Sequence, residues 1–288
     1  MDTKALIKKV RKIEIKTKGL TSQIFSGEYH SAFKGQGMAF SEVREYALGD
    51  EIRTIDWNVT ARFNEPFVKV FEEERELTVM LVVDVSPSGM FGTKNQLKRE
   101  TITELCAVLA FSASSNKDRI GVILFSDKVV KYIPPKKGKT HILQIIRTLL
   151  NQEALGHETD IESALQFLSK IQKKRATVFL LSDFRSKTYD NALKIVSRKH
   201  DLIALKFSDC GEYHLPKIGL AKFKDLETGK SVWVNTLSKK AREQYRDKQQ
   251  DFDYHIKQQF RKYNIDYVDL KTNQDYIKPL MNLFERRN

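Results

Sequence analysis

The chain has 288 residues, of which 41% are hydrophobic and 30% charged, so it has enough apolar material for a substantial core. No apolar run approaches the roughly 20 residues that cross a bilayer. Charges are scattered through the first 18 residues, which argues against a signal peptide. The two cysteines, Cys106 and Cys210, match no metal or redox spacing. We therefore expect a cytoplasmic chain with neither a membrane span nor a disulfide framework.

Excess basic charge gives the chain a formal net charge of +13. The lysines and arginines fall into groups around residues 4–18, 136–139 and 170–175, next to or within segments predicted to be helical. Charge spread in this way is typical of solvated helix faces, and no nucleic-acid recognition motif accompanies it. Nucleic-acid binding is thus the weaker interpretation. An acidic protein partner fits the same surface.

The N-terminal quarter has little regular pattern. Leu6, Val10 and Ile13 predict a helix over residues 3–18. Residues 21–65 carry aromatics and glycines with no sustained period, and residues 67–71 have the composition of an edge strand. We expect residues 1–75 to be an extension whose irregular part packs on a domain formed by residues 76–288.

From residue 76 onward, strand-like and helix-like segments alternate. The predicted strands are 77–83, 119–125, 129–133, 177–181, 202–207 and 265–270, with a further pair at 222–226 and 231–234. The predicted helices are 98–114, 142–150, 161–171, 191–198, 238–263 and 276–284. This alternation predicts an α/β fold with a doubly wound, mostly parallel, Rossmann-type sheet. The two-residue link 127–128 makes the third strand an antiparallel edge strand.

In the common strand order 3-2-1-4-5-6, ligands bind where the winding reverses, between strands 1 and 4. Asp84, Ser86 and Ser88 follow the first strand, and Asp183 follows the fourth. Thr159 precedes the helix before that fourth strand, at a plausible N-cap. These oxygen donors favour a hard cation such as Mg²⁺, or Mn²⁺. Few charged ligands would leave the cation able to accept one more carboxylate from outside.

This constellation resembles the metal-ion-dependent adhesion site of von Willebrand factor A domains. All five positions of that pattern are filled, by Asp84, Ser86, Ser88, Thr159 and Asp183. The resemblance implies that the hydroxyls ligate the ion directly or nearly so, and that the aspartates act directly or through water. It also implies that a partner's Glu or Asp completes the coordination shell.

The segment that precedes the metal-site pattern indicates a more specific family. Its residues are Phe40-Ser41-Glu42-Val43-Arg44-Glu45-Tyr46, Gly49-Asp50, Arg53-Thr54-Ile55-Asp56-Trp57 and Ala61-Arg62. With the metal pattern, they resemble the bacterial family called domain of unknown function 58, over about residues 25–288. The resemblance implies a partnership with a MoxR-type AAA+ ATPase. Gly89 and Met90 follow Ser88 here, whereas many members have Met directly after the second serine. Some members of that family also carry membrane helices, and this sequence contains no apolar run long enough to form one.

Seven residues of this segment are candidate signature residues: Arg44, Tyr46, Asp50, Arg53, Asp56, Trp57 and Arg62. They could form a docking surface for a partner. We favour instead an internal ion-pair and hydrogen-bond network that anchors the segment, with Trp57 packed inward.

We therefore expect a non-enzymatic protein-interaction module, an adaptor or co-chaperone working with a MoxR-type ATPase on an unknown client. The alternative is a metal-dependent hydrolase, of phosphoesterase type, that uses the same carboxylates. It lacks an evident base or a second metal-binding set. A serine nucleophile is disfavoured, because the histidines show no paired spacing and no clear link to the site.

Overall fold

The structure is a computed structural model that describes residues 38–63, 65–73, 77–93, 97–152, 156, 158–226 and 229–287. The helix predicted over residues 3–18 lies outside these residues. Two compact units divide the chain, one formed by Phe33–Leu77 and a larger one that contains Thr78–Asn288. The division into residues 1–75 and 76–288, with the extension packed on the core, stays a prediction.

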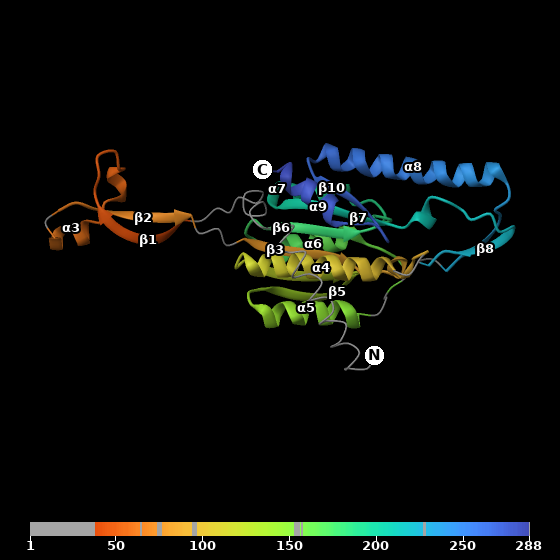
Figure 1. The fold of residues 1–288 in the computed structure, drawn as a ribbon, viewed down its shortest axis with the longest axis horizontal. Coiled ribbons are helices and arrows are strands. Elements are labelled where there is room, and N and C mark those ends of the chain that lie inside the picture. Colours follow the sequence, from red (N-terminus) through yellow and green to blue (C-terminus); the bar gives the residue numbers. More distant parts are fainter. Residues whose placement is uncertain are drawn as a thin grey trace. The chain divides into compact units, whose positions relative to one another are not determined.

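The smaller unit is built on two antiparallel strands, β1 (Met38–Glu45) and β2 (Phe67–Glu73) (Figure 1). A 3₁₀ turn, η1 (Ile52–Thr54), and a short helix, α3 (Trp57–Phe63), connect them. The strand predicted at residues 67–71 is thus present. Of the segment expected to be irregular, residues 21–37 lie outside the described residues, and over residues 38–63 the expectation was wrong, because a strand, a 3₁₀ turn and a short helix form there. The register of β1 shifts between Phe40 and Glu42, which breaks the alternation expected of a strand. Seven residues of α3 are too few to show a helical period.

The larger unit is organised around a six-stranded sheet of order β10-β7-β6-β3-β4-β5. Its strands are β3 (Thr78–Asp84), β4 (Arg119–Phe125), β5 (Val129–Lys136), β6 (Thr177–Ser182), β7 (Asp201–Ser208) and β10 (Asp266–Lys271). Neighbours pair in parallel except β4 and β5, which are antiparallel. Counted along this unit, the order is 3-2-1-4-5-6. The sequence prediction of sheet type, strand order and antiparallel edge is confirmed.

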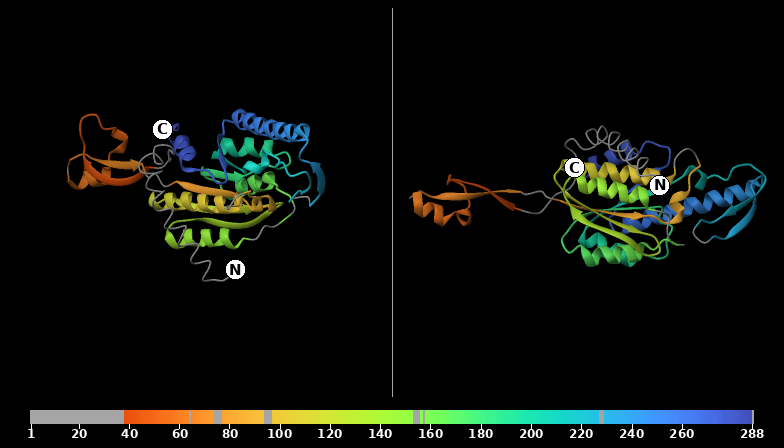
Figure 2. Two further views of the ribbon diagram at one scale, coloured as in Figure 1. Left: turned by 45° about the vertical axis from the view of Figure 1, so that its right-hand side comes forward. Right: turned by 90° about the horizontal axis from the view of Figure 1, so that it is seen from below.

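Helices cover both faces of this sheet (Figure 2). They are α4 (Lys98–Ser115), α5 (Lys139–Asn151), α6 (Ile161–Ile171), α7 (Asp190–Lys199), α8 (Lys239–Lys262) and α9 (Ile277–Glu285). Residues 79–83 of β3 are fully buried, as expected of a central strand covered on both faces. On one face, α6, α7 and the carboxyl half of α8 share a hydrophobic cluster with the sheet. Among the helices described, none is both long enough and apolar enough to cross a bilayer.

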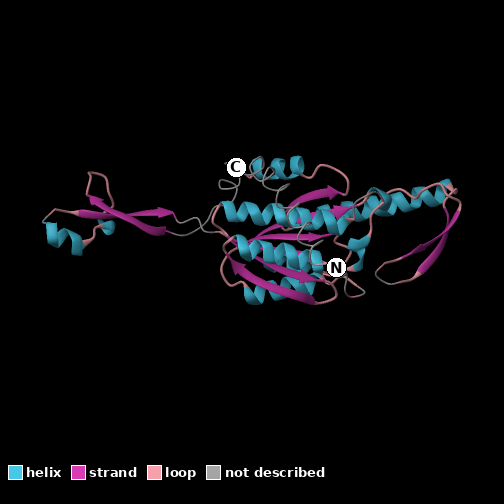
Figure 3. Cartoon of the chain, turned by 60° about the horizontal axis from the view of Figure 1, so that its bottom comes forward, coloured by secondary structure: helices cyan, strands magenta, loops and turns pink. Residues whose placement is uncertain are grey.

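A separate hairpin, β8 (Leu220–Lys224) with β9 (Ser231–Asn235), leaves the larger unit between β7 and α8 (Figure 3). Its base is held by the buried Thr236, whose hydroxyl donates to Gly219 O at 2.7 Å and accepts from Ile218 N at 3.0 Å. Arg242 of α8 donates to Thr236 O at 2.7 Å. The predicted strand pair is therefore present, anchored to the start of α8.

Candidate functional site

The candidate site lies where β3 and β6 end. These strands are parallel neighbours with Val83 beside Leu181, so Asp84 at the end of β3 lies next to Ser182 at the end of β6. Asp183 follows at once. The winding of the sheet reverses between these two strands, which makes this crevice the expected ligand position of an open α/β sheet.

Asp84 is buried, with 7% of its surface exposed, and both of its carboxylate oxygens accept hydrogen bonds. Ser86 N donates to Oδ1 at 2.9 Å, and Ser182 Oγ donates to Oδ2 at 2.6 Å. Burial raises the pKa of Asp84 to about 6, and the charge of Asp183 adds to the rise, while the hydrogen bonds oppose it. Two buried carboxylates thus lie close enough for the charge of one to disfavour ionisation of the other.

The two serines extend the hydrogen bonding around Asp84. Ser86 precedes a 3₁₀ turn, η2 (Pro87–Met90), which begins with a proline that fixes the backbone φ angle. The hydroxyl oxygens of Ser86 and Ser88 lie 3.0 Å apart. Asp84, Ser86, Ser88 and Ser182 thus form one hydrogen-bonded group, which includes three of the five predicted residues. Asp183 directly follows Ser182, and its charge acts on Asp84.

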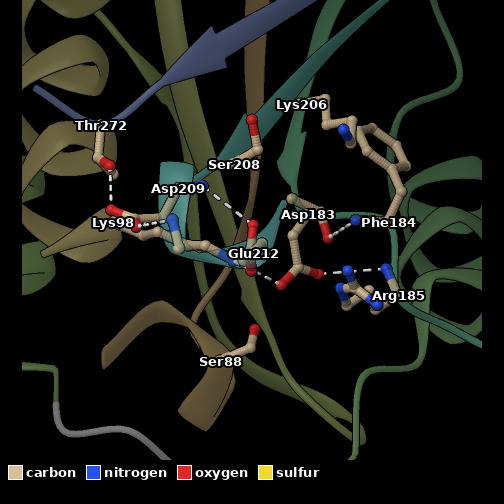
Figure 4. Close-up of polar contacts among 12 residues, drawn as sticks. Ser88, Lys98, Asp183, Phe184, Arg185, Lys206, Ser208, Asp209, Glu212 and Thr272 are labelled. Atoms are coloured by element: carbon tan, nitrogen blue, oxygen red, sulfur yellow. Dashed lines mark hydrogen bonds and ion pairs between the residues drawn. The ribbon is translucent and has the colours of Figure 1, made fainter. Parts of the chain in front are cut away.

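Asp183 is 5% exposed and held from several sides. Arg185 N donates to Oδ1 at 3.1 Å, and Lys98 Nζ donates to Oδ2 at 3.2 Å (Figure 4). Burial acts to raise the pKa of Asp183, but Lys98, the backbone bond from Arg185 and the Arg185 guanidinium outweigh it, so the pKa is lowered. Phe184 follows with φ of 62°, a left-handed conformation that bulky residues rarely adopt. Such a backbone outlier is a frequent mark of a functional site.

Lys98, the first residue of α4, was missed by the sequence analysis. It is 1% exposed, and its ammonium contacts both Asp183 and Glu212. Glu212 closes a 3₁₀ turn, η3 (Cys210–Glu212), after β7. Burial acts to lower the pKa of Lys98, but the two carboxylates outweigh it and raise the pKa. One sequence signal was available, since a lysine in the first turn of a helix opposes the helix dipole and needs a specific partner.

The loop that carries Thr159 is fixed at the edge of the same crevice. Thr159 is 4% exposed, and its carbonyl accepts a bond from Ser186 Oγ at 2.7 Å, three residues beyond Asp183. Asp160 N donates to Ser126 O, at the end of β4, at 2.7 Å. The prediction of Thr159 as the helix cap was wrong. Asp160 directly precedes α6, so it is the residue that caps the helix, and its carboxylate accepts from Ser163 N at 3.0 Å. Thr159 lies one residue too early in the chain.

The residues present fit a divalent cation. Within the described ranges, no group of three or more His, Cys, Asp or Glu side chains is arranged to hold a metal, so a cation held here would take some of its ligands from hydroxyls. Three carboxylates, of Asp84, Asp183 and Glu212, and two cations, the Lys98 ammonium and the Arg185 guanidinium, act on one another in this site. Ionisation of these five groups leaves one negative charge uncompensated, and all the remaining donors are oxygens. That donor set suits Mg²⁺ or Mn²⁺ better than a soft metal.

The signature residues belong to the smaller unit, where polar contacts join some of them. Arg44 Nη2 lies 2.6 Å from Asp50 Oδ1, and Asp50 Oδ2 also accepts from Ala47 N at 2.8 Å. Asp56 accepts from Asn58 N at 3.0 Å and lies 3.4 Å from Lys69 Nζ.

Within the smaller unit taken by itself, several of the signature residues lie at the surface, and the network that anchors the segment on the core stays a prediction. The side chain of Arg44 is 45% exposed, and Arg53 and Arg62 are exposed as well. Trp57, expected to pack inward, is 67% exposed, while Tyr46 is half-buried. The physical reason is size. A unit of this length cannot enclose every aromatic side chain, and α3 contains no buried residue.

The strand order, the antiparallel edge strand and the crevice between β3 and β6 define a doubly wound, mostly parallel α/β domain. The chain belongs to the family described as "Protein of unknown function DUF58", whose model matches residues 42–253. That match spans the signature segment, all five predicted metal-site residues, and Lys98 and Glu212.

Other proteins are similar to this chain in sequence or in fold. An uncharacterized protein of Mycobacterium tuberculosis is 28% identical over 232 residues, which cover 80% of this chain and 73% of that protein. Among solved structures, the conserved hypothetical protein BatB of Bacteroides thetaiotaomicron has a TM-score of 0.49 at 14% identity, over 73% of this chain and 98% of that one. The SpRpn10 VWA domain has a TM-score of 0.40 at 10% identity, over 72% and 94%.

Proposed function

We propose that the larger unit binds Mg²⁺ or Mn²⁺ through Asp84, Ser86, Ser88, Thr159 and Asp183, and thereby holds an acidic side chain of a protein partner. The observation that carries the proposal is the hydrogen-bonded group of Asp84, Ser86, Ser88 and Ser182, with a second buried carboxylate, of Asp183, directly beside it. When bound, the cation would supply a Lewis-acidic position for an incoming carboxylate. The protein's own residues fix the donors and keep the crevice largely buried.

The hydroxyl donors account for the preference for an acidic ligand. Ser86 and Ser88 are neutral, and Lys98 offsets part of the carboxylate charge. A divalent cation held by such a set keeps a deficit of negative charge, which a carboxylate from outside can fill. The partner's Asp or Glu is therefore the expected final ligand.

An exposed hairpin close to the site supports a protein-interaction role. It follows η3, whose Glu212 contacts Lys98, and it lies at the end of the sheet where the parallel strands end (Figure 3). Leu220, Val232 and Trp233 are 68%, 61% and 63% exposed. Exposed apolar groups of this size are typical of interaction surfaces. Lys222, opposite Trp233 in the register, adds positive charge that suits an acidic partner.

We propose further that the module is a non-enzymatic adaptor or co-chaperone of the cytoplasm, acting with a MoxR-type AAA+ ATPase on a client. The support for this partner is the family resemblance of the signature segment together with the metal-site pattern.

The first test is calorimetric titration of Mg²⁺ and Mn²⁺ into the wild type and Asp183→Ala. Saturable binding should be lost in the variant and kept in Lys239→Gln, which alters an exposed ion pair with Glu243 on α8. Absence of binding in folded wild type would overturn the metal site. A second test is retention of a purified MoxR-type ATPase on the immobilised chain, which a chelator should abolish.

The alternative function is a metal-dependent hydrolase of phosphoesters that uses the same carboxylates. In that case Asp84, with its raised pKa of about 6, would have to accept a proton as well as hold the cation. Turnover of a generic phosphoester by the wild type, absent in Asp84→Ala, would favour the hydrolase. Binding of a nucleic acid that weakens steeply with salt would favour a third role.

A further inference from the structure

The ammonium of Lys98 is held in a position that the surrounding structure determines closely. Its Nζ lies 3.2 Å from Asp183 Oδ2, contacts Glu212 Oε1, and sits 5.9 Å from the centre of the Phe91 ring. The other Glu212 oxygen accepts from Asp209 N at 3.0 Å, which fixes this carboxylate in the capping box of η3. The cation is thus built into the fold (Figure 4).

Asp209, in turn, is anchored on the far side of η3. It accepts from Thr93 Oγ1 at 2.6 Å and Gly211 N at 2.8 Å, and it contacts Thr272. The chain of contacts from Thr272 through Asp209 and Glu212 to Lys98 leaves the ammonium little room to move. Since Lys98 is 1% exposed, water cannot screen its charge effectively.

A fixed, unscreened positive charge beside Asp183 must oppose the binding of a second cation in the same crevice. It also reduces the negative charge available to that cation. Without Lys98, the three nearby carboxylates and the Arg185 guanidinium would leave two negative charges uncompensated. With Lys98, they leave one. A bound divalent ion then keeps a net positive charge, which preserves its attraction for an external carboxylate.

We propose that Lys98 is an internal counter-cation that sets the divalent-cation affinity of this crevice and keeps the bound ion receptive to an acidic ligand. The inference rests on the proposed metal-binding function. Lys98 acts as a positioning residue and makes no contact with the ion. Glu212 is its partner in this role, because it supplies the negative charge that Lys98 offsets.

Three variants that change the net charge of the site test the proposal. Lys98→Met makes the site more negative, Glu212→Gln makes it less negative, and the double variant restores the wild-type total. Titration calorimetry with Mg²⁺ alone should show about tenfold or greater tightening in Lys98→Met and about tenfold or greater weakening in Glu212→Gln. The double variant should bind within about threefold of the wild type. A purely structural role for the ion pair predicts weakening in all three.

The outcomes separate this inference from the proposed function. Mg²⁺ binding by the wild type with no tightening in folded Lys98→Met would overturn the inference and leave the metal site standing. Binding by Lys98→Met but not by the wild type would support the inference and overturn metal binding by the native protein. Absence of binding in all four proteins would overturn both. If Lys98→Met does not fold, Glu212→Gln must weaken binding and the double variant must restore it, or the inference fails.

Discussion

Replacement of Asp84 by Asn is expected to stabilise the metal-free protein at neutral pH. Burial, with the charge of Asp183, raises the pKa of Asp84 from 3.8 to about 6. A folded-state pKa above the unfolded-state value means that the folded protein binds this proton more tightly. The contribution of the protonated Asp84 carboxyl to the stability of the folded protein is therefore complete below about pH 3.8, and it is lost as the pH rises through about 6. At pH 8 the ionised carboxylate opposes folding.

The size of the effect follows from the shift. A pKa change of about two units, at about 1.36 kcal/mol per unit, corresponds to roughly 3 kcal/mol. Asparagine keeps the shape and one acceptor for Ser86 N, but its amide NH₂ cannot accept the bond from Ser182 Oγ, at a cost of about 1 kcal/mol. The net gain in the free energy of unfolding for Asp84→Asn is then about 2 kcal/mol at pH 8.

The assay is urea denaturation of both proteins in the presence of a chelator, at pH 8 and pH 4. The advantage of Asp84→Asn should be present at pH 8 and absent at pH 4, where the wild-type carboxyl is largely protonated. With Mg²⁺ at pH 8, the wild type should gain stability and the variant should not. Glu243→Gln, which changes a half-exposed carboxylate on α8, is the matched control. A variant less stable than the wild type at pH 8 with chelator would refute the reasoning.

Three further predictions concern other parts of the molecule. Ser88→Ala should weaken Mg²⁺ binding at least about tenfold in calorimetry while changing the thermal midpoint little, because it removes a neutral donor from a half-buried position. Trp57→Ala should change the free energy of unfolding by no more than about 0.5 kcal/mol, since the indole is 67% exposed, and a larger loss would indicate that it is covered in solution. Gly121→Ala should destabilise the protein by about 1–3 kcal/mol, because a Cβ there would lie 2.9 Å from Met80 Sδ and from backbone atoms of Ile133 and Pro135. The free energy of unfolding of Gly121→Ala is measured by denaturant titration. A value equal to that of the wild type would contradict this close packing around Gly121.

Much of the larger unit could be predicted because the periodicity of each segment agrees with the way in which the segments connect. Alternating apolar strands and helices define a parallel sheet, and right-handed crossovers restrict its order. The segments predicted at 119–125 and 161–171 match β4 (Arg119–Phe125) and α6 (Ile161–Ile171) at both ends. Once β3 and β6 are neighbours, the residues that end them must meet, so Asp84 and Asp183 could be placed together from sequence.

The smaller unit shows where such reasoning fails. The pairing of β1 with β2 depends on partners about 30 residues apart and contains a register shift, so no local period reveals it. The exposure of Trp57 could not be predicted from the sequence either. An aromatic residue is apolar in any sequence pattern, and only the size of the available core decides whether it is buried.

By itself, the sequence determined the sheet order, the antiparallel edge and the set of oxygen donors at the strand ends, because strand periodicity and chain connectivity leave few arrangements open. Only the tertiary structure decided that Lys98 and Glu212 join this site. They lie 114 residues apart, and each alone is typical of a solvated helix or turn. Their burial as a pair follows from the packing of α4 and η3 at the ends of β6 and β7, where an unpaired charge would be strongly unfavourable.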